Sequence, residues 1–188
     1  GLIENKLKEH NLLRSTRRKV VKHGQSINLG CFRIEFIKTN HSISDAAALA
    51  IYTPAGIIVH TGDFKIDYTP VFGDAIDLGR FAELGKKGVL ALMCESTNVE
   101  REGYTPSERT VGRTLNHLFD ENSGHRIIVA TFASNVDRVQ QIINCACKYG
   151  KKVVVEGRSM VNTISTAAEL GYIKIPENTL IGIEEMRN

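Results

Sequence analysis

The sequence has no long apolar run, few cysteines and only a small excess of positive charge. No stretch approaches the roughly 18–20 consecutive apolar residues that a membrane-spanning helix needs, and residues 1–10 lack the pattern of a signal peptide. Apolar residues make up 42% and charged residues 24% of the 188 residues, which is typical of a soluble globular protein with a buried core. The length suits one domain or two small ones.

The cysteines indicate neither a disulfide framework nor a C-x-x-C zinc motif. There are four of them: Cys31, Cys94, Cys145 and Cys147. Cys145 and Cys147 fall on one predicted helix, where this spacing turns them toward different faces. We expect reduced thiols in the core of a cytoplasmic protein.

The net charge of +3 does not by itself indicate a nucleic-acid partner. Basic residues form one cluster, which consists of Arg14, Arg17, Arg18, Lys19 and Lys22. Such a cluster can contact phosphates, but basic side chains are also common along a solvated strand edge. We interpret the basic cluster as part of a solvated strand edge.

Up to about residue 100 the pattern predicts hairpins and antiparallel strands after a short helix that ends near Asn11. Five strands are expected in this part, over residues 19–23, 31–38, 46–52, 57–60 and 89–94. The segment Thr53-Pro54-Ala55-Gly56 suits a type I turn and therefore a hairpin. Leu78, Phe81 and Leu84 suggest a short helix before the last strand, which is strongly apolar.

From about residue 105 the pattern changes to helices that alternate with apolar strands. Thr105-Pro106-Ser107-Glu108 combines a capping box with proline at the first helical position. Strands are expected over residues 126–131 and 152–155, each followed by a helix, and Gly171 stops the last helix. The apolar residues expected on the first of these helices are Val136, Val139, Ile142, Ile143 and Ala146. This order is typical of a parallel sheet wrapped by helices. We place a domain boundary near residues 98–105.

Two residues suited to a hydrolytic metal ion follow apolar strands, His41 in N-H-S and Asp63 in T-G-D-F. Each alone is more often structural, but adjacent strand ends would bring the imidazole and the carboxylate together. An aspartate can also bridge two metal ions about 3.5–4 Å apart. Catalytic zinc normally takes three protein ligands, so the pair predicts half of a metal centre. We interpret His60 as a supporting or structural residue.

Other polar residues follow the predicted strands at positions where a ligand can bind. Glu95 ends a strand expected to be buried, so it either orients a histidine or binds a nearby helix N-terminus. Ser134 and Asn135 lie between a strand and a helix, where they can cradle a phosphate, although Ser134 can equally be only a helix cap. Arg158 and Ser159 occupy the equivalent position one β-α unit later, which favours a shared surface.

Five motifs in order make the chain resemble ribonuclease J: T-N-H-S-I-S-D, V-H-T-G-D-F-K-I-D, L-M-C-E-S-T-N, A-T-F-A-S-N-V-D-R and V-V-V-E-G-R-S-M-V-N. Ribonuclease J is the bacterial branch of the metallo-β-lactamase nucleases that carry a β-CASP domain. The resemblance implies an α/β chain with two parts. Residues 1–100 would be part of a metallo-β-lactamase αββα sandwich, from the C-terminal part of its first half. Residues 101–188 would be the N-terminal part of a Rossmann-like β-CASP domain with a parallel sheet.

The resemblance also implies roles for single residues. His41 matches a histidine on one zinc ion, and Asp63 matches the aspartate that bridges two. Glu95 matches the acidic residue that pairs with a general-acid histidine, which lies outside this chain. The RNA-binding residues implied or favoured by position are Ser134, Asn135, Arg138, Arg158 and Ser159.

The activity implied by the resemblance is zinc-dependent cleavage of RNA. Two zinc ions activate a water that attacks the phosphodiester in line, leaving a 5′-phosphate and a 3′-hydroxyl. Family members act as endonucleases and 5′-to-3′ exonucleases on single-stranded RNA, in mRNA turnover and rRNA maturation. We expect the parent protein to be cytoplasmic, not bound to a membrane, and to form a homo-oligomer or a complex with a paralogue.

The family's H-x-H-x-D-H motif does not occur here, since none of the six histidines has that spacing. The chain is therefore predicted to be an internal fragment, with that motif upstream of Leu2 and two further histidine motifs downstream of Asn188. We expect the fragment to be inactive alone and to hold zinc weakly or not at all. Two alternatives remain open: a non-catalytic RNA-binding or scaffolding piece, and a DNA nuclease of the same superfamily.

Overall fold

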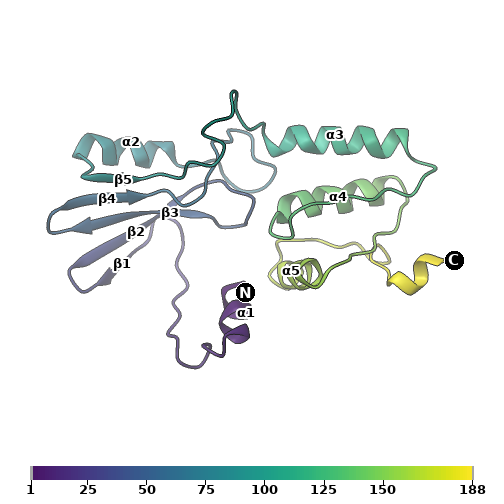
Figure 1. The fold of residues 1–188 in the computed structure, drawn as a ribbon, viewed down its shortest axis with the longest axis horizontal. Helices are drawn as coiled ribbons and strands as arrows, with labels where there is room; N and C mark the ends of the chain where they lie inside the picture. The colour runs from purple at the N-terminus through teal and green to yellow at the C-terminus, as the bar shows by residue number, and fades with distance from the viewer. Residues whose placement is uncertain (1, 188) are drawn as a thin grey trace. The chain divides into compact units, whose positions relative to one another are not determined.

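The computed structural model describes residues 2–187 and divides the chain into two compact units (Figure 1). We call residues 19–41 and 45–107 the sheet unit. The helical unit comprises the described residues 2–18, 42–44 and 108–187. Each unit has its own core and is described by itself.

The sheet unit contains five strands in the order β1-β2-β3-β4-β5. Their bounds are Ser26–Leu29 for β1, Phe32–Lys38 for β2, Ala47–Thr53 for β3, Gly56–His60 for β4 and Ala91–Met93 for β5. The first four pair antiparallel, and β5 pairs parallel with β4. The predicted hairpin at Thr53-Pro54-Ala55-Gly56 is confirmed, because Thr53 pairs with Gly56 across the turn.

Helix α2 (Leu78–Lys87) packs on one face of this sheet (Figure 1). Asp77 caps its first turn by accepting the Arg80 N–H at 2.9 Å. The core between helix and sheet consists of Ile37, Ala48, Ala50, Val59 and Leu84. Alternation along the strands puts Phe36 and Leu49 on the opposite face, where they are half-buried. Apolar residues on both faces are consistent with one sheet of a layered sandwich.

The prediction of a strand over residues 19–23 is wrong, because pairing with β2 starts later, where Gln25 accepts the Phe36 N–H. The strand β1 instead lies between the two segments that were predicted as strands over residues 19–23 and 31–38. Val20 is 93% exposed, and the five residues of the basic cluster are also exposed. The cluster is therefore solvated as expected, but it lies on irregular backbone. The hairpin turn falls at Gly30, whose φ of +60° suits glycine.

A buried ion pair connects α2 to the sheet. The Arg80 Nε donates to Glu35 Oε1 at 2.6 Å, and the Tyr52 hydroxyl donates to Glu35 Oε2 at 2.8 Å. The Arg33 guanidinium stacks 3.6 Å above the centre of the Tyr52 ring. Hydrogen bonds from Arg80, and to a lesser extent from Tyr52, hold the pKa of Glu35 below its usual value.

The depressed pKa of Glu35 predicts a loss of stability in acid. The pair stabilises the fold above the unfolded-state pKa of about 4.3 and is lost as the pH falls through the lower folded-state value. We expect Glu35→Gln to lower the free energy of unfolding at neutral pH by about 1–3 kcal/mol and to flatten its dependence on pH in acid. Urea denaturation from about pH 6 to about pH 3 measures both effects. An unchanged pH dependence in the variant would contradict this role.

The apolar segment before Glu95 is shorter and more exposed than the sequence predicts. Only Ala91–Met93 form a strand, and β5 lies at the end of the strand order. Leu92 and Met93 are 64% and 55% exposed. Hydrophobicity alone predicts burial here, but an edge strand can leave both faces open. Glu95 therefore follows an exposed strand and not a buried one.

The helical unit contains four α-helices and a terminal 3₁₀ helix among the described residues. Their bounds are Leu2–Glu9 for α1, Glu108–Glu121 for α3, Val136–Lys148 for α4, Arg158–Glu169 for α5 and Ile183–Arg187 for η1. Helix α4 lies between α3 and α5 (Figure 1). Its Val136, Val139 and Ile143 pack with α5, and its Cys145 and Ala146 pack with α3. The predicted apolar pattern of α4 and the end of α5 before Gly171 are confirmed.

Two local predictions in this unit are wrong. Helix α3 begins at Glu108, later than the capping box implies, and the Ser107 hydroxyl instead donates to the Thr69 carbonyl. Residues 126–131 and 152–155 form no regular strands, and one parallel bridge joins Val153 to Leu180. Parallel strands depend on neighbours distant in sequence, so apolar β-branched composition alone does not secure their pairing. The α/β class is confirmed.

The four cysteines are all free thiols. Cys145 is buried and Cys147 is exposed, so their predicted orientation to different faces is confirmed. Burial raises the pKa of the Cys145 thiol. Only Cys145 is in the core, which corrects the expectation of core thiols, because Cys31 lies in a turn, Cys94 follows an edge strand and Cys147 lies on an exposed helix face. Within residues 2–187 no helix combines the length and apolar character that a membrane span requires.

Candidate metal and nucleic-acid sites

The sheet unit gathers three polar residues at one edge. Because β2, β4 and β5 run in the same direction, their carboxyl ends lie at the same edge of the sheet. His41 follows β2, Asp63 follows β4 and Glu95 follows β5. The antiparallel meander and the final parallel strand thus bring together residues from three separate motifs.

His41 and Asp63 lie close enough to share a metal ion. The His41 Nε2 and the Asp63 Oδ2 are 3.9 Å apart, and the Asp63 side chain is 70% exposed. Zinc binds imidazole nitrogen and carboxylate oxygen at about 2.0–2.2 Å, so one ion can contact both atoms. Within the described residues no group of three potential ligands is present. The pair fits part of a metal centre but does not close one.

Glu95 binds the backbone of the neighbouring loop. Its Oε1 accepts the Phe64 N–H at 2.8 Å, and its Oε2 accepts the Thr97 N–H at 3.1 Å. Hydrogen bonds from Thr97 and from the Phe64 N–H lower the pKa of Glu95, and His41 contributes a smaller lowering. The carboxylate is therefore ionised at neutral pH and holds the residue that follows Asp63.

His60 and Asn40 also belong to this edge. His60 Nδ1 accepts the Gly62 N–H at 3.0 Å, which suits the supporting role expected from the sequence. Asn40 is buried, and its side chain makes hydrogen bonds with the Asp74 carbonyl and the Ile76 N–H. Sequence reasoning did not single out Asn40, and its position next to His41 was the only local signal.

The residues expected near RNA are in the helical unit and have different environments. Asn135, not Ser134, caps α4 by accepting the Arg138 N–H at 3.1 Å, and this corrects the alternative of a Ser134 cap. Asn135 is buried, whereas Ser134 is exposed. The Arg138 guanidinium makes two hydrogen bonds to the buried Glu108, at 2.8 and 3.0 Å. Arg138 thus connects α4 to α3.

Arg158 and Ser159 lie at the start of α5, and both are exposed. Gly157 precedes them with a φ of +92°, and no side chain caps this helix end. Backbone N–H groups of the first helical turn are suited to anions. The two residues are therefore more accessible to a phosphate than Asn135 and Arg138 are.

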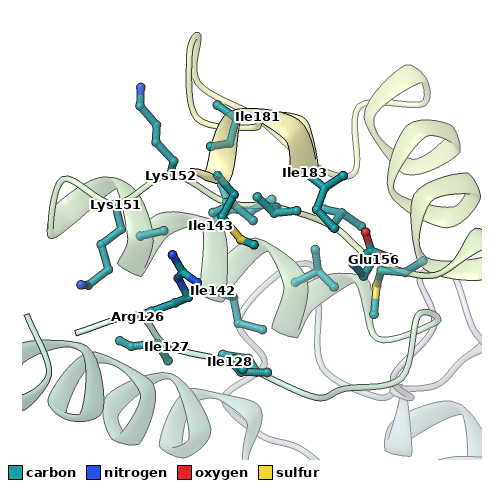
Figure 2. A pocket seen from close by; sticks show the side chains of 18 of the residues that line it. Arg126, Ile127, Ile128, Ile142, Ile143, Lys151, Lys152, Glu156, Ile181 and Ile183 are labelled. Atoms are coloured by element: carbon teal, nitrogen blue, oxygen red, sulfur yellow. The ribbon is translucent and has the colours of Figure 1, made fainter. Parts of the chain in front are cut away.

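A cavity of about 710 Å³ lies in the helical unit between the segments that were expected to form strands (Figure 2). Its lining includes Ile127, Ile128 and Val153 from these segments and Ile143 from α4. In Figure 2, Arg126, Lys151 and Lys152 lie toward one end and Glu156 toward the other. The lining excludes Ser134, Asn135, Arg138, Arg158 and Ser159.

Comparison with known proteins gives consistent matches. Residues 124–188 match the family described as Ribonuclease J, beta-CASP domain. The chain is 46% identical to Ribonuclease J of Synechocystis sp., over 100% of this chain and 29% of the relative. It is 46% identical to Ribonuclease J of Helicobacter pylori, over 99% of this chain and 27% of the relative. Ribonuclease J 1 of Streptococcus pyogenes is 44% identical, over 100% of this chain and 33% of the relative.

A crystal structure of a protein of unknown function from Enterococcus faecalis has a similar fold. The TM-score is 0.62 at 19% identity, and the match covers 91% of this chain and 43% of that chain. Fold and sequence together define a segment of a β-CASP protein. The chain belongs to the ribonuclease J family, and it spans between 27% and 33% of the length of these curated relatives.

Proposed function

We propose that this chain is a segment of a zinc-dependent ribonuclease, which we call the parent protein. The observation that carries the proposal is the combination of 44–46% identity to ribonuclease J along the chain with a His41–Asp63 pair at one sheet edge. The parent protein would cleave single-stranded RNA both as an endonuclease and as a 5′-to-3′ exonuclease. Its roles would be mRNA decay and rRNA maturation in the cytoplasm.

In this proposal His41 and Asp63 supply part of the ligand set, and other segments of the parent protein supply the rest. Bound zinc would lower the pKa of a water molecule and stabilise charge on the phosphate. Glu95 fixes the loop that carries Asp63 by accepting the Phe64 N–H. By resemblance to ribonuclease J, Glu95 would also contact a general-acid histidine from another segment of the parent protein. This chain alone would be inactive.

RNA binding is assigned to the helical unit on grounds of position and exposure. Arg158 and Ser159 at the start of α5, together with Ser134, offer exposed polar groups to a phosphate. Arg138 keeps its proposed role near the RNA path, with Glu108 holding its guanidinium in a fixed orientation. Asn135 would contribute to RNA binding indirectly, by capping α4 and so fixing the end of the loop that precedes this helix. Assembly with a second copy or a paralogue is part of the proposal for the parent protein.

A second candidate is a non-catalytic RNA-binding or scaffolding role. It is favoured by the absence of a three-ligand group within residues 2–187 and by the exposed Arg158. Salt-dependent binding of single-stranded RNA by the metal-free chain, lost in Arg158→Ala, would support it. Preference for a matched DNA oligonucleotide would instead favour a DNA nuclease.

Zinc titration compares the metal binding of the 188-residue chain with that of the parent protein. We expect the 188-residue chain to bind zinc weakly or not at all, because two ligands leave the ion incompletely coordinated. The parent protein should take up two zinc ions per copy and cleave single-stranded RNA only when loaded. Calorimetric titration, elemental analysis and cleavage of a labelled oligonucleotide measure these outcomes. Stoichiometric, micromolar-or-tighter zinc binding by the chain would contradict the expectation.

A further inference from the structure

The loop that carries Asp63 is held through its backbone from two sides. The Phe64 N–H donates to Glu95 Oε1 at 2.8 Å, and the Lys65 N–H donates to the Asn40 carbonyl at 2.8 Å. Glu95 follows β5, and Asn40 follows β2. Two successive amides after Asp63 are therefore attached to the ends of two different strands. These contacts constrain the path of the backbone at Asp63, while its exposed carboxylate stays open to a ligand.

Asn40 is itself fixed by its side chain. It is 8% exposed, its Nδ2 donates to the Asp74 carbonyl at 3.0 Å, and its Oδ1 accepts the Ile76 N–H at 2.7 Å. A carboxamide supplies the donor and the acceptor that these two backbone groups need. Removing it would leave the Asp74 carbonyl and the buried Ile76 N–H without these partners. The side chain thus anchors the peptide whose carbonyl binds Lys65.

We propose that Asn40 is a positioning residue that sets the spacing between His41 and Asp63. His41 is the next residue along the chain, so the orientation of the Asn40 peptide determines the position of the His41 backbone that carries the imidazole. The same peptide binds Lys65 in the Asp63 loop, so one residue fixes both sides of the pair. The proposal rests on the proposed function, in which the 3.9 Å pair holds a metal ion.

Asn40→Ala in the parent protein tests this role, with Tyr52→Phe as the control. Tyr52→Phe also removes hydrogen bonds in the sheet unit, those with Glu35 and Arg80, but Tyr52 pairs with Arg33 at the opposite end of β2. We expect Asn40→Ala to weaken zinc binding and to lower kcat by about 10–100-fold each, the effect typical of lost support for metal ligands. The KM for RNA should stay unchanged, because the RNA contacts are assigned to other residues. Tyr52→Phe should change neither value.

Hydrogen exchange of the metal-free parent protein provides a readout that does not depend on activity. Amides of residues 64, 65 and 76 should exchange at least about tenfold faster in Asn40→Ala and at the wild-type rate in Tyr52→Phe. If Asn40→Ala does not fold, Asn40→Asp, which keeps an acceptor for the Ile76 N–H, is measured instead.

The outcomes distinguish this inference from the proposed function. Unchanged zinc affinity, kcat and amide exchange in a folded Asn40 variant would overturn the positioning role. A wild-type parent protein without zinc-dependent ribonuclease activity would overturn the proposed function, and the exchange of residues 64, 65 and 76 would still decide whether Asn40 holds the loop.

Discussion

Asp63→Asn in the parent protein should reduce RNA cleavage by more than about 100-fold and remove bound zinc. Loss of a residue that only supports a metal ligand already costs about 10–100-fold, so loss of a ligand should cost more. Asparagine has nearly the same shape as aspartate but carries no charge and offers only one oxygen. The Asp63 side chain is 70% exposed, so the substitution should leave the fold intact. Cleavage of a labelled single-stranded RNA and elemental analysis measure the two effects.

The matched control for this substitution is Asp120→Asn, which removes the same charge from an exposed position on α3. Asp120 should tolerate the change with activity and zinc content at wild-type levels. RNA binding by Asp63→Asn should also persist, because the contacts to RNA are assigned to the helical unit. Retention of full activity and zinc in Asp63→Asn would refute its assignment as a metal ligand.

Leu84→Ala should lower the free energy of unfolding of the 188-residue chain by about 2–5 kcal/mol. Leu84 is 0% exposed and packs between α2 and the sheet with Ile37, Ala48 and Val59. Truncation removes buried apolar surface and leaves a cavity that a regular sheet cannot easily fill. Because α2 attaches to the sheet mainly through this core and the Arg80–Glu35 pair, the loss should affect the whole sheet unit.

Leu90→Ala is the control for this prediction, because Leu90 has the same side chain in the same unit and is 62% exposed. Its substitution should cost less than about 1 kcal/mol. Urea denaturation monitored by circular dichroism compares the two variants. Equal losses would show that Leu84 does not contribute more to the core than Leu90 does.

Prediction from sequence succeeded where the signal is local. The apolar spacing along α4, the turn at Thr53-Pro54-Ala55-Gly56 and the stop of α5 before Gly171 all depend on residues within a few positions of one another. The five ordered motifs likewise indicated the family, since motif order is read directly from the chain. The expectation that His41 and Asp63 lie together came from adjacent strand ends, and their side chains are 3.9 Å apart, but their role as metal ligands stays a prediction.

Only the tertiary structure decided which distant groups meet. Residues 19–23 and 126–131 have the composition of strands, but strand formation depends on neighbours that local sequence does not specify. The partners of Arg138 and Glu95 follow from packing across long sequence separations, since Arg138 binds Glu108 and Glu95 binds the Phe64 N–H. The sequence alone thus predicted α4, α5, the turn and the family. The three-dimensional contacts decided the strand pairing and the support of the His41–Asp63 pair, because both are non-local.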